Sequence, residues 1–279
     1  MTAAPGAAGA APSKGDTGRN RYLAENRVAV AAPASLAEFT REVRRVERLL
    51  GPRAGRPPLR VLDIGCGSGP WLVRWREHGA VAYGVDFDVD LVGRARVRPE
   101  LAADPPQVAA ADATRLPLAD RTFDVVTLNS LLEHVPRWEA VLSESARVLA
   151  PGGVLVLHTT NRWHPMPGEV RNFPFYPWLP DPIMRRTLDW IMKHRRDLVG
   201  WTSFPAVNWF TYPGLSAALR RLGLEPNDRL DLTRPEELGG IKALGRGLLR
   251  DGDNAPPARA LYWFLVNTTS LYAKRPDAG

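Results

Sequence analysis

The residues with the clearest chemical potential lie at positions 61–69, where Asp63, Gly65, Gly67 and Gly69 recur at every second position. Apolar residues precede the first glycine, and Trp71 opens a pattern typical of a helix. Glycine at alternate positions lets the backbone adopt positive φ and brings a ligand close to bare main chain. The helix that follows points its N-terminal amides toward that ligand. The run therefore predicts a strand, a turn and a helix that together cradle a cofactor.

Polar residues also follow the next three predicted strands. Asp86 ends the strand predicted over residues 81–85, and it follows Asp63 by 23 positions (86 − 63). This is close to the offset of about 20 at which an acid binds ribose in dinucleotide folds, because a carboxylate can accept two hydrogen bonds from a diol. Asp112 suits an exocyclic amine of adenine, and Asn129 with Ser130 follows the fourth strand. The alternative for each residue is an ordinary helix cap.

A regular alternation of elements must position these groups. Predicted strands at 59–64, 81–85, 107–111, 123–128 and 154–159 alternate with helices at 71–78, 90–97 and 138–149. Apolar strands separated by helices indicate a parallel sheet covered on both faces, with ligands at the carboxyl ends of the strands. A helix at 212–222, a sixth strand at 224–232 and a last strand at 264–273 follow. We expect an α/β fold with a Rossmann-like, doubly wound, mostly parallel seven-stranded sheet and an inserted helical and aromatic cap.

The composition divides the chain into segments. Residues 1–18 are rich in Ala, Gly and Pro and predict a disordered tail, not a signal peptide. Residues 19–58 form an N-terminal helical segment with a helix at 35–50, whose Arg41, Arg44, Arg45 and Arg48 we expect on a solvated face. The core comprises 59–160 and 212–275, the cap insertion 161–211, and a second small insertion 235–261.

Five stretches of the core carry a family resemblance. Residues 61–69 resemble motif I of the class I S-adenosylmethionine-dependent methyltransferases, and Gly-Val-Asp at 84–86 resembles the acidic end of motif II. Ala-Asp-Ala-Thr-Arg-Leu-Pro at 111–117 resembles motif III, residues 123–126 with 132–135 resemble the motif IV region, and Arg-Val-Leu-Ala-Pro-Gly-Gly at 147–153 resembles the family's run before strand five. The resemblance is strongest to the small-molecule branch that includes ubiquinone-type methyltransferases.

The resemblance implies S-adenosylmethionine as the cofactor. By position, Asp63, Gly65, Gly67 and Gly69 would cradle its methionine part, Asp86 would hold the ribose, and Asp112 with Ala113 would hold the adenine. Asn129 would line the mouth for methyl transfer. The adjoining Cys66, Phe87 and Ser130 complete the predicted cofactor set.

The acceptor side of the site depends on the insertion. Its aromatic residues could enclose an apolar or aromatic acceptor, or they could form a small core of their own. Methyl transfer to a hydroxyl needs alignment, desolvation and a base; His164 is the first choice for that base, and His134 is either a second candidate or structural. The candidate acceptor-binding residues are Asn161, Trp163, Phe175, Tyr176, Trp201 and Trp209.

These observations favour methyl transfer to a small hydrophobic or aromatic acceptor, such as a secondary-metabolite, quinone or lipid-like molecule. The favoured methylated atom is a hydroxyl oxygen. An N- or C-methyltransferase acting on a small anionic or isoprenoid acceptor is the alternative. From other classes, a nicotinamide-dependent oxidoreductase is disfavoured by the glycine spacing, and a non-catalytic cofactor-binding partner subunit is the remaining alternative. No His or carboxylate spacing predicts a metal site.

Charge and cysteine content bound the partners and the compartment. The 279-residue chain carries a net charge of +7 and a single cysteine, Cys66, which fits the reducing cytoplasm. Its basic residues are scattered and its aromatic residues cluster in the insertion, which disfavours a nucleic-acid partner. No apolar run reaches the roughly 18 residues of a membrane span. The basic helix near 183–196 leaves two alternatives, peripheral contact with an anionic membrane surface or a solvated lid; the oligomeric state is left open.

Overall fold

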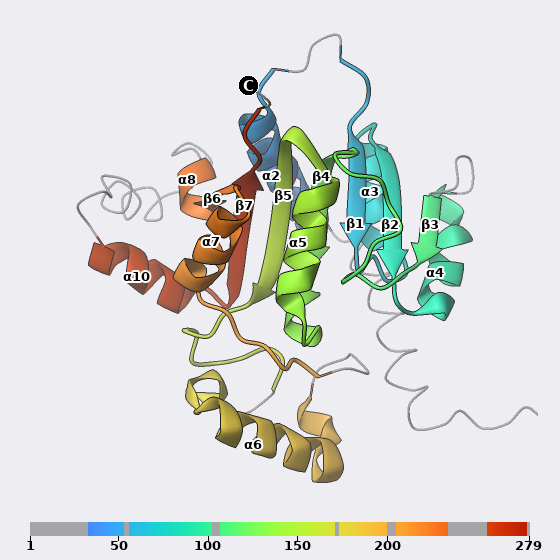
Figure 1. The fold of residues 1–279 in the computed structure, drawn as a ribbon. Coiled ribbons are helices and arrows are strands. Elements are labelled where there is room, and N and C mark those ends of the chain that lie inside the picture. Colours follow the sequence, from blue (N-terminus) through green and yellow to red (C-terminus); the bar gives the residue numbers. More distant parts are fainter. Residues whose placement is uncertain are drawn as a thin grey trace, which may run out of the picture.

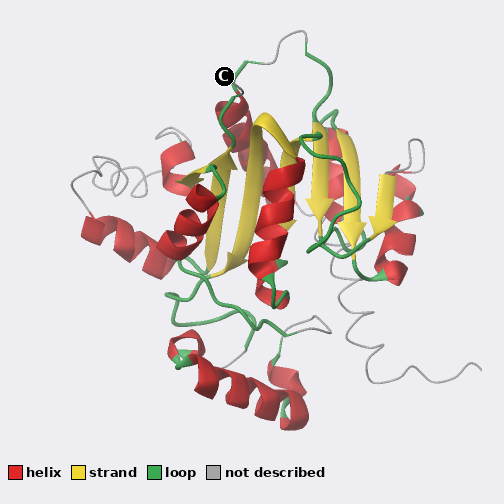
Figure 2. Cartoon of the chain, viewed as in Figure 1, coloured by secondary structure: helices red, strands yellow, loops and turns green. Residues whose placement is uncertain are grey.

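The computed structural model describes residues 33–52, 56–101, 107–170, 173–199, 205–233 and 256–277. Seven strands form one sheet in the order β3-β2-β1-β4-β5-β7-β6, with helices on both faces (Figures 1 and 2). The first five strands in this order are parallel, and β7 runs antiparallel to both β5 and β6. The prediction of a doubly wound, mostly parallel seven-stranded α/β fold is confirmed.

The elements have the following bounds. The strands are β1 Arg60–Ile64, β2 Val81–Asp86, β3 Gln107–Ala110, β4 Phe123–Asn129, β5 Leu149–Thr160, β6 Glu225–Asp228 and β7 Thr268–Lys274. The helices are α2 Pro33–Leu50, α3 Pro70–Glu77, α4 Val89–Arg96, α5 Trp138–Val148, α6 Asp181–His194, α7 Tyr212–Arg221, α8 Arg229–Leu232 and α10 Pro256–Leu265. Short 3-10 turns lie at η1 Pro99–Leu101, η2 Leu132–His134, η3 Tyr176–Trp178 and η4 Arg196–Leu198.

Two apolar layers enclose the sheet. On one face, α2, α3 and α4 contribute to a cluster that includes Phe39, Trp75 and Val92; on the other face, α5 and α7 contribute Leu142 and Leu219 to a second cluster. The strand order turns at β1, because the chain proceeds outward through β2 and β3 and then returns to place β4 on the other side. Ligands of such sheets bind at the carboxyl ends beside this reversal, so the fold places the candidate site at the ends of β1 and β4.

The cap, residues 161–211, carries α6 beyond the carboxyl ends of the parallel strands (Figure 1). Its buried Met184, Leu188 and Ile191 belong to a separate apolar cluster with side chains of the same insertion. The backbone amides of Val207 and Asn208 donate to the carbonyl oxygen of Glu133 at 2.8 and 3.1 Å, which ties the cap to the loop after β4. The cap is therefore a small packed unit attached at the candidate site.

The prediction for the C-terminal third was wrong in two places. The sixth strand ends at Asp228 and not at Leu232, because Asp228 and Asp231 form a reciprocal capping box that starts α8. The last strand begins at Thr268, because residues 256–265 form α10, with Pro256 in its first turn. Of the predicted second insertion, residues 235–255 lie outside the described residues, as does the predicted N-terminal tail. No helix in the described ranges has the length and apolarity needed to cross a bilayer.

Candidate active site

The glycine turn leaves β1 with the geometry of a ligand cradle. Gly65, Gly67 and Gly69 have φ values of +77°, +54° and +79°, a region that favours glycine. The amides of Gly65 and Cys66 both donate to the carbonyl oxygen of Val85, at 2.8 and 3.0 Å, and so fix the turn on β2. Gly69 precedes the first residue of α3. The predicted strand, turn and helix are all present.

A glycine in the neighbouring strand makes room for this turn. A Cβ atom on Gly84 would lie 2.8 Å from the Cys66 Sγ atom and 2.9 Å from Leu72 Cδ1, closer than real Cβ atoms approach. Burial raises the pKa of the Cys66 thiol, and the side chain is 3% exposed. Cys66 is therefore a packing group under the turn and not an activated thiolate.

Asp86 lies at the end of β2, directly beside the turn. Its Oδ2 atom accepts a hydrogen bond from the Gly67 amide and its Oδ1 atom accepts one from the Asp88 amide, both at 2.8 Å. The side chain is partly exposed, and each oxygen keeps a further lone pair for a ligand hydroxyl. The next residue, Phe87, is 74% exposed. Asp86 and Phe87 thus form an open carboxylate and an open aromatic face at the rim of the cradle.

Asp63 is buried beneath the turn, where it bridges β1 and β4. It is 2% exposed and accepts a hydrogen bond of 2.6 Å from the Thr127 hydroxyl. Burial raises the pKa of this carboxyl to about 7, although Thr127 and the nearby Asn129 oppose the rise. The Nδ2 atom of Asn129 is itself buried and has no well-formed hydrogen bond within the described residues. A buried donor of this kind is costly unless a ligand supplies an acceptor.

Asp63→Asn is expected to remove a pH dependence of stability. The carboxyl titrates near 3.8 when unfolded and near 7 when folded, so the folded state binds the extra proton between these values and wild-type stability falls as pH rises from about 4 to 7. The asparagine variant lacks this loss, which amounts to a few kcal/mol. Urea unfolding of the cofactor-free protein at pH 5 and pH 8 measures it; an equal change in both proteins would contradict the assignment.

Asp112 and Ala113 follow β3 at the same edge of the sheet. The amide of Ala111 donates to the carbonyl oxygen of Asp86 at 2.9 Å, which brings this loop beside the end of β2. Asp112 Oδ1 accepts bonds from the amide and the hydroxyl of Thr114, both at 2.8 Å, and these bonds lower the pKa of the carboxyl. Asp112 therefore caps its own turn, a local role similar to the helix cap considered as its alternative, while its other oxygen, Oδ2, lies 3.9 Å from the Arg137 guanidinium.

The predicted residues after β4 adopt distinct conformations. Ser130 has a positive φ of +50° and its amide donates to the carbonyl oxygen of His158 at 2.9 Å, so it serves the backbone of the loop. Leu131, one residue further, packs over Gly65, where an added Cβ would meet its Cδ1 at 3.0 Å. The loop after β4 thereby covers one side of the glycine turn.

The two candidate bases differ in their surroundings. His164 lies in the loop after β5, and its Nδ1 atom is engaged with the backbone of Met166. His134 ends η2, and its Nδ1 atom is buried without a hydrogen-bond partner among the described residues. Its neighbour Glu133 is buried, accepts a 2.7 Å bond from the Thr159 hydroxyl, and has its pKa raised by burial. His134 thus has a ring nitrogen with no hydrogen-bonding role in the described part of the fold.

Three predicted acceptor contacts serve the fold of the cap instead. The Asn161 amide donates to the carbonyl oxygens of Trp263 and Val266, both at 2.6 Å, and its oxygen accepts from the Trp163 amide. Tyr176 and Trp209 are 0% and 8% exposed in the cap cluster. Tyr176 and Trp209 are packed inside the protein because the insertion forms its own core, which was the alternative interpretation, whereas Asn161 links the start of the insertion to the end of α10.

The remaining predicted acceptor contacts are more open. Trp163 is partly exposed and its ring lies 5.7 Å from that of Trp263. Phe175 is 51% exposed and its ring lies 4.9 Å from that of Trp178. Trp201 lies outside the described residues.

The sequence interpretation missed two residues of the cradle. Thr127 donates to Asp63, and Gly84 admits the turn. A polar residue inside the otherwise apolar end of β4 was the available signal for Thr127, and Gly84 had been noted only as part of a motif. In the described part of the chain, no group of three His, Cys, Asp or Glu side chains is arranged to bind a metal ion.

Comparison with known proteins gives one family match. A family model described as a methyltransferase domain matches residues 35–227. The chain is 41% identical over 113 residues to a demethylmenaquinone methyltransferase of Beutenbergia cavernae, covering 39% of this chain and 45% of that protein. It is 35% identical over 113 residues to a ubiquinone biosynthesis O-methyltransferase of Rhizobium rhizogenes, covering 40% of this chain and 46% of the relative. The chain therefore spans less than half the length of these curated relatives.

A solved structure supports the fold. An S-adenosylmethionine-dependent methyltransferase from Mesorhizobium loti has a TM-score of 0.51 at 21% identity, and the match covers 82% of this chain and 95% of that one.

Proposed function

The chain belongs to the S-adenosylmethionine-dependent methyltransferase family, and from this premise we propose that it transfers a methyl group to a small hydrophobic or aromatic acceptor, at a hydroxyl oxygen. The observation that carries the proposal is the set of polar groups at the carboxyl ends of β1, β2 and β4. It comprises the glycine turn, the Asp86 carboxylate and the buried Asn129 amide.

The cradle residues fit S-adenosylmethionine. Asp86 offers two carboxylate oxygens to a ribose diol, and the exposed ring of Phe87 offers a flat apolar face beside it. The buried Nδ2 of Asn129, which has no well-formed hydrogen bond within the described residues, can donate to an acceptor atom of the cofactor's methionine part. When bound, S-adenosylmethionine would supply a methyl group attached to a positively charged sulfur. The methyl group would pass to the nucleophile, and the sulfur would be left as a neutral thioether.

The chain has two further tasks in this reaction, alignment and proton removal. The cap holds apolar side chains over the carboxyl ends of the strands and would exclude water from the acceptor. His134 is the better candidate for the base, because its Nδ1 has no other hydrogen bond in the described ranges, whereas His164 Nδ1 is engaged within its own loop. This reverses the order of preference from sequence.

The class of acceptor is inferred from the cap and from relatives. The exposed aromatic side chains of the cap, Phe175 and Trp178, favour a hydrophobic ring system over a charged metabolite. One relative is named a demethylmenaquinone methyltransferase, and another is named a ubiquinone biosynthesis O-methyltransferase. We therefore propose a quinol-like or phenol-like acceptor, with carbon or nitrogen methylation as the competing outcome.

Calorimetric titration of the purified protein tests the cofactor half. We expect S-adenosylmethionine and its demethylated product to bind, and NADH not to bind; no binding of the first two would overturn the proposal. Incubation with apolar catechol, quinol and phenol acceptors then tests the acceptor half, and mass spectrometry with NMR assigns the methylated atom. A carbon- or nitrogen-bound methyl group would refute O-methylation while leaving methyl transfer intact.

A further inference from the structure

Exposed apolar side chains are concentrated in the cap and in α10. Twelve large hydrophobic residues of the described chain are exposed, and seven of them lie in the cap and α10: Met166, Phe175, Trp178, Ile183, Trp190, Leu261 and Leu265. The two segments meet where the rings of Trp178 and Phe264 lie 6.0 Å apart. Scattered single exposures are normal, but a concentration in two adjacent segments marks an interaction surface.

The outer face of α6 combines these apolar groups with cations. Ile183 and Trp190 are seven residues apart, so they lie on one side of the helix, and they are 51% and 54% exposed. Arg186 follows Ile183 by three residues, and Lys193 follows Trp190 by three residues, so the two members of each pair are neighbours on the helix surface. The opposite face, with Met184, Leu188 and Ile191, is buried against the cap.

These cations of α6 have no ion-pair partner in the part of the chain that the structure describes. No ion pair within the described residues involves Arg185, Arg186, Lys193 or Arg196, although the neighbouring Arg162 and Arg195 pair with Asp181 and Asp197. Of the acids on α6, Asp189 is the one outside these pairs. The face therefore carries excess positive charge beside an exposed tryptophan. Tryptophan and basic residues with this arrangement are typical of helices that lie at a membrane interface.

We propose that the outer face of α6, formed by Ile183, Arg186, Trp190 and Lys193, docks onto an anionic lipid surface. Its charge complements anionic headgroups, and Ile183 and Trp190 can enter the boundary between headgroups and acyl chains. The cap lies beyond the carboxyl ends of the strands, so docking would bring the candidate active site next to the lipid (Figure 1). Delivery of an apolar acceptor from the bilayer rests on the proposed function, whereas docking itself does not.

Vesicle sedimentation of the full chain tests the docking. We expect binding to phosphatidylcholine vesicles containing about one third phosphatidylglycerol, weak binding to pure phosphatidylcholine, and loss of binding at high salt. Arg186→Glu with Lys193→Glu should weaken binding about 30-fold or more, since each cation near an anionic surface contributes about 1 kcal/mol. Ile183→Ala with Trp190→Ala should weaken it on both kinds of vesicle.

The matched control reverses two exposed cations outside the cap, Arg94 on α4 and Arg220 on α7, neither of which has a described ion pair. Arg94→Glu with Arg220→Glu makes the same change in net charge and should bind vesicles like the wild type. Equal loss in both double variants, or binding that ignores phosphatidylglycerol, would overturn the proposal. A dimer in light scattering that Trp190→Ala dissociates, with no vesicle binding, would assign the face to a second copy. Because the assay needs no turnover, its failure is distinct from a failure of methyl transfer.

Discussion

Replacing Asp86 by Ala is expected to weaken S-adenosylmethionine binding by about 100-fold or more. The variant complex would lack the two charge-assisted hydrogen bonds between the carboxylate and the ribose, each worth about 1.5–3 kcal/mol. A loss of 1.4 kcal/mol corresponds to a tenfold change in Kd. Titration calorimetry with the cofactor measures the loss directly. Methyl transfer at subsaturating cofactor should fall by the same factor.

Two further variants separate a direct contact from damage to the turn. Asp86 also accepts the 2.8 Å bond from the Gly67 amide, so Asp86→Asn, which keeps an oxygen for that amide, should hold the turn and still lose most of the affinity. Asp88→Ala removes the same charge two residues away, where Asp88 caps α4 through the amides of Asp90 and Leu91. Asp88→Ala should lower the free energy of unfolding by about 1 kcal/mol and leave the Kd for S-adenosylmethionine within about twofold of the wild-type value. Full affinity in Asp86→Asn would show that the acid only supports the turn.

The cradle was predictable because its determinants are local. Gly65, Gly67 and Gly69 specify positive φ by residue type, and the apolar residues before them specify a buried strand. Asp86 is the last residue of β2 and Asp112 lies two residues after β3, so the parallel order of the sheet brings them to one edge without information from distant residues. The same holds for the helices α3, α4 and α5, whose predicted bounds differ from the observed bounds by at most one residue at each end.

The acceptor side could not be predicted, because it depends on contacts between distant residues. Asn161 was predicted to contact the acceptor, yet it binds carbonyl oxygens more than 100 positions away, at the end of α10. Tyr176 and Trp209 have the composition of a ligand pocket, but they pack on each other with ring centroids 5.8 Å apart. Residue type alone does not distinguish an aromatic core from an aromatic site.

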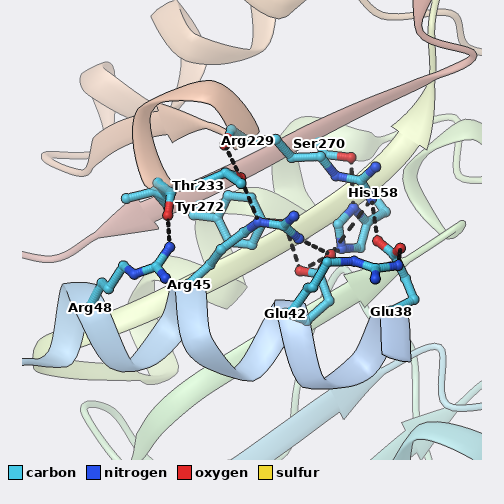
Figure 3. Close-up of polar contacts among 11 residues, drawn as sticks. Glu38, Glu42, Arg45, Arg48, His158, Arg229, Thr233, Ser270 and Tyr272 are labelled. Carbon is cyan, nitrogen blue, oxygen red and sulfur yellow. Dashed lines mark hydrogen bonds and ion pairs between the residues drawn. The ribbon is translucent and has the colours of Figure 1, made fainter. Parts of the chain in front are cut away.

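The arginines of α2 show the same limit. Arg45 was expected on a solvated face, but its side chain is 6% exposed. Arg48 was also placed there, yet it donates to the carbonyl oxygen of Leu232. The reason is that α8, nearly 190 residues later, packs against this side of the helix (Figure 3). The periodicity of α2 showed which residues share a face, but not what that face contacts.

Glu42 is the centre of the polar network that joins α2 to the sheet (Figure 3). It accepts a 2.6 Å bond from the Tyr272 hydroxyl, pairs with Arg45 at 3.0 Å, and lies 3.4 Å from His158 Nε2. On its other side, His158 Nδ1 lies 2.9 Å from the Ser270 hydroxyl. Burial alone would raise the pKa of Glu42, but His158, Arg45 and Tyr272 outweigh it and lower the pKa to about 2. The ionised carboxylate therefore stabilises the attachment of α2.

Glu42→Gln is expected to lower the free energy of unfolding by about 3 kcal/mol at pH 7, because removing one partner leaves the buried Arg45 uncompensated. The contribution is fully present above the unfolded pKa of 4.5 and disappears as pH falls toward 2. The difference between wild type and variant should therefore shrink across that window, which urea unfolding at pH 7, 4 and 2.5 measures. Glu38→Gln is the matched control on the same helix: Glu38 is 39% exposed and pairs with Arg41 and Arg229 at the surface, so it should cost less than about 1 kcal/mol. Equal losses in the two variants, or a Glu42→Gln loss that is unchanged at pH 2.5, would show that the network does not hold α2 through the charge of Glu42.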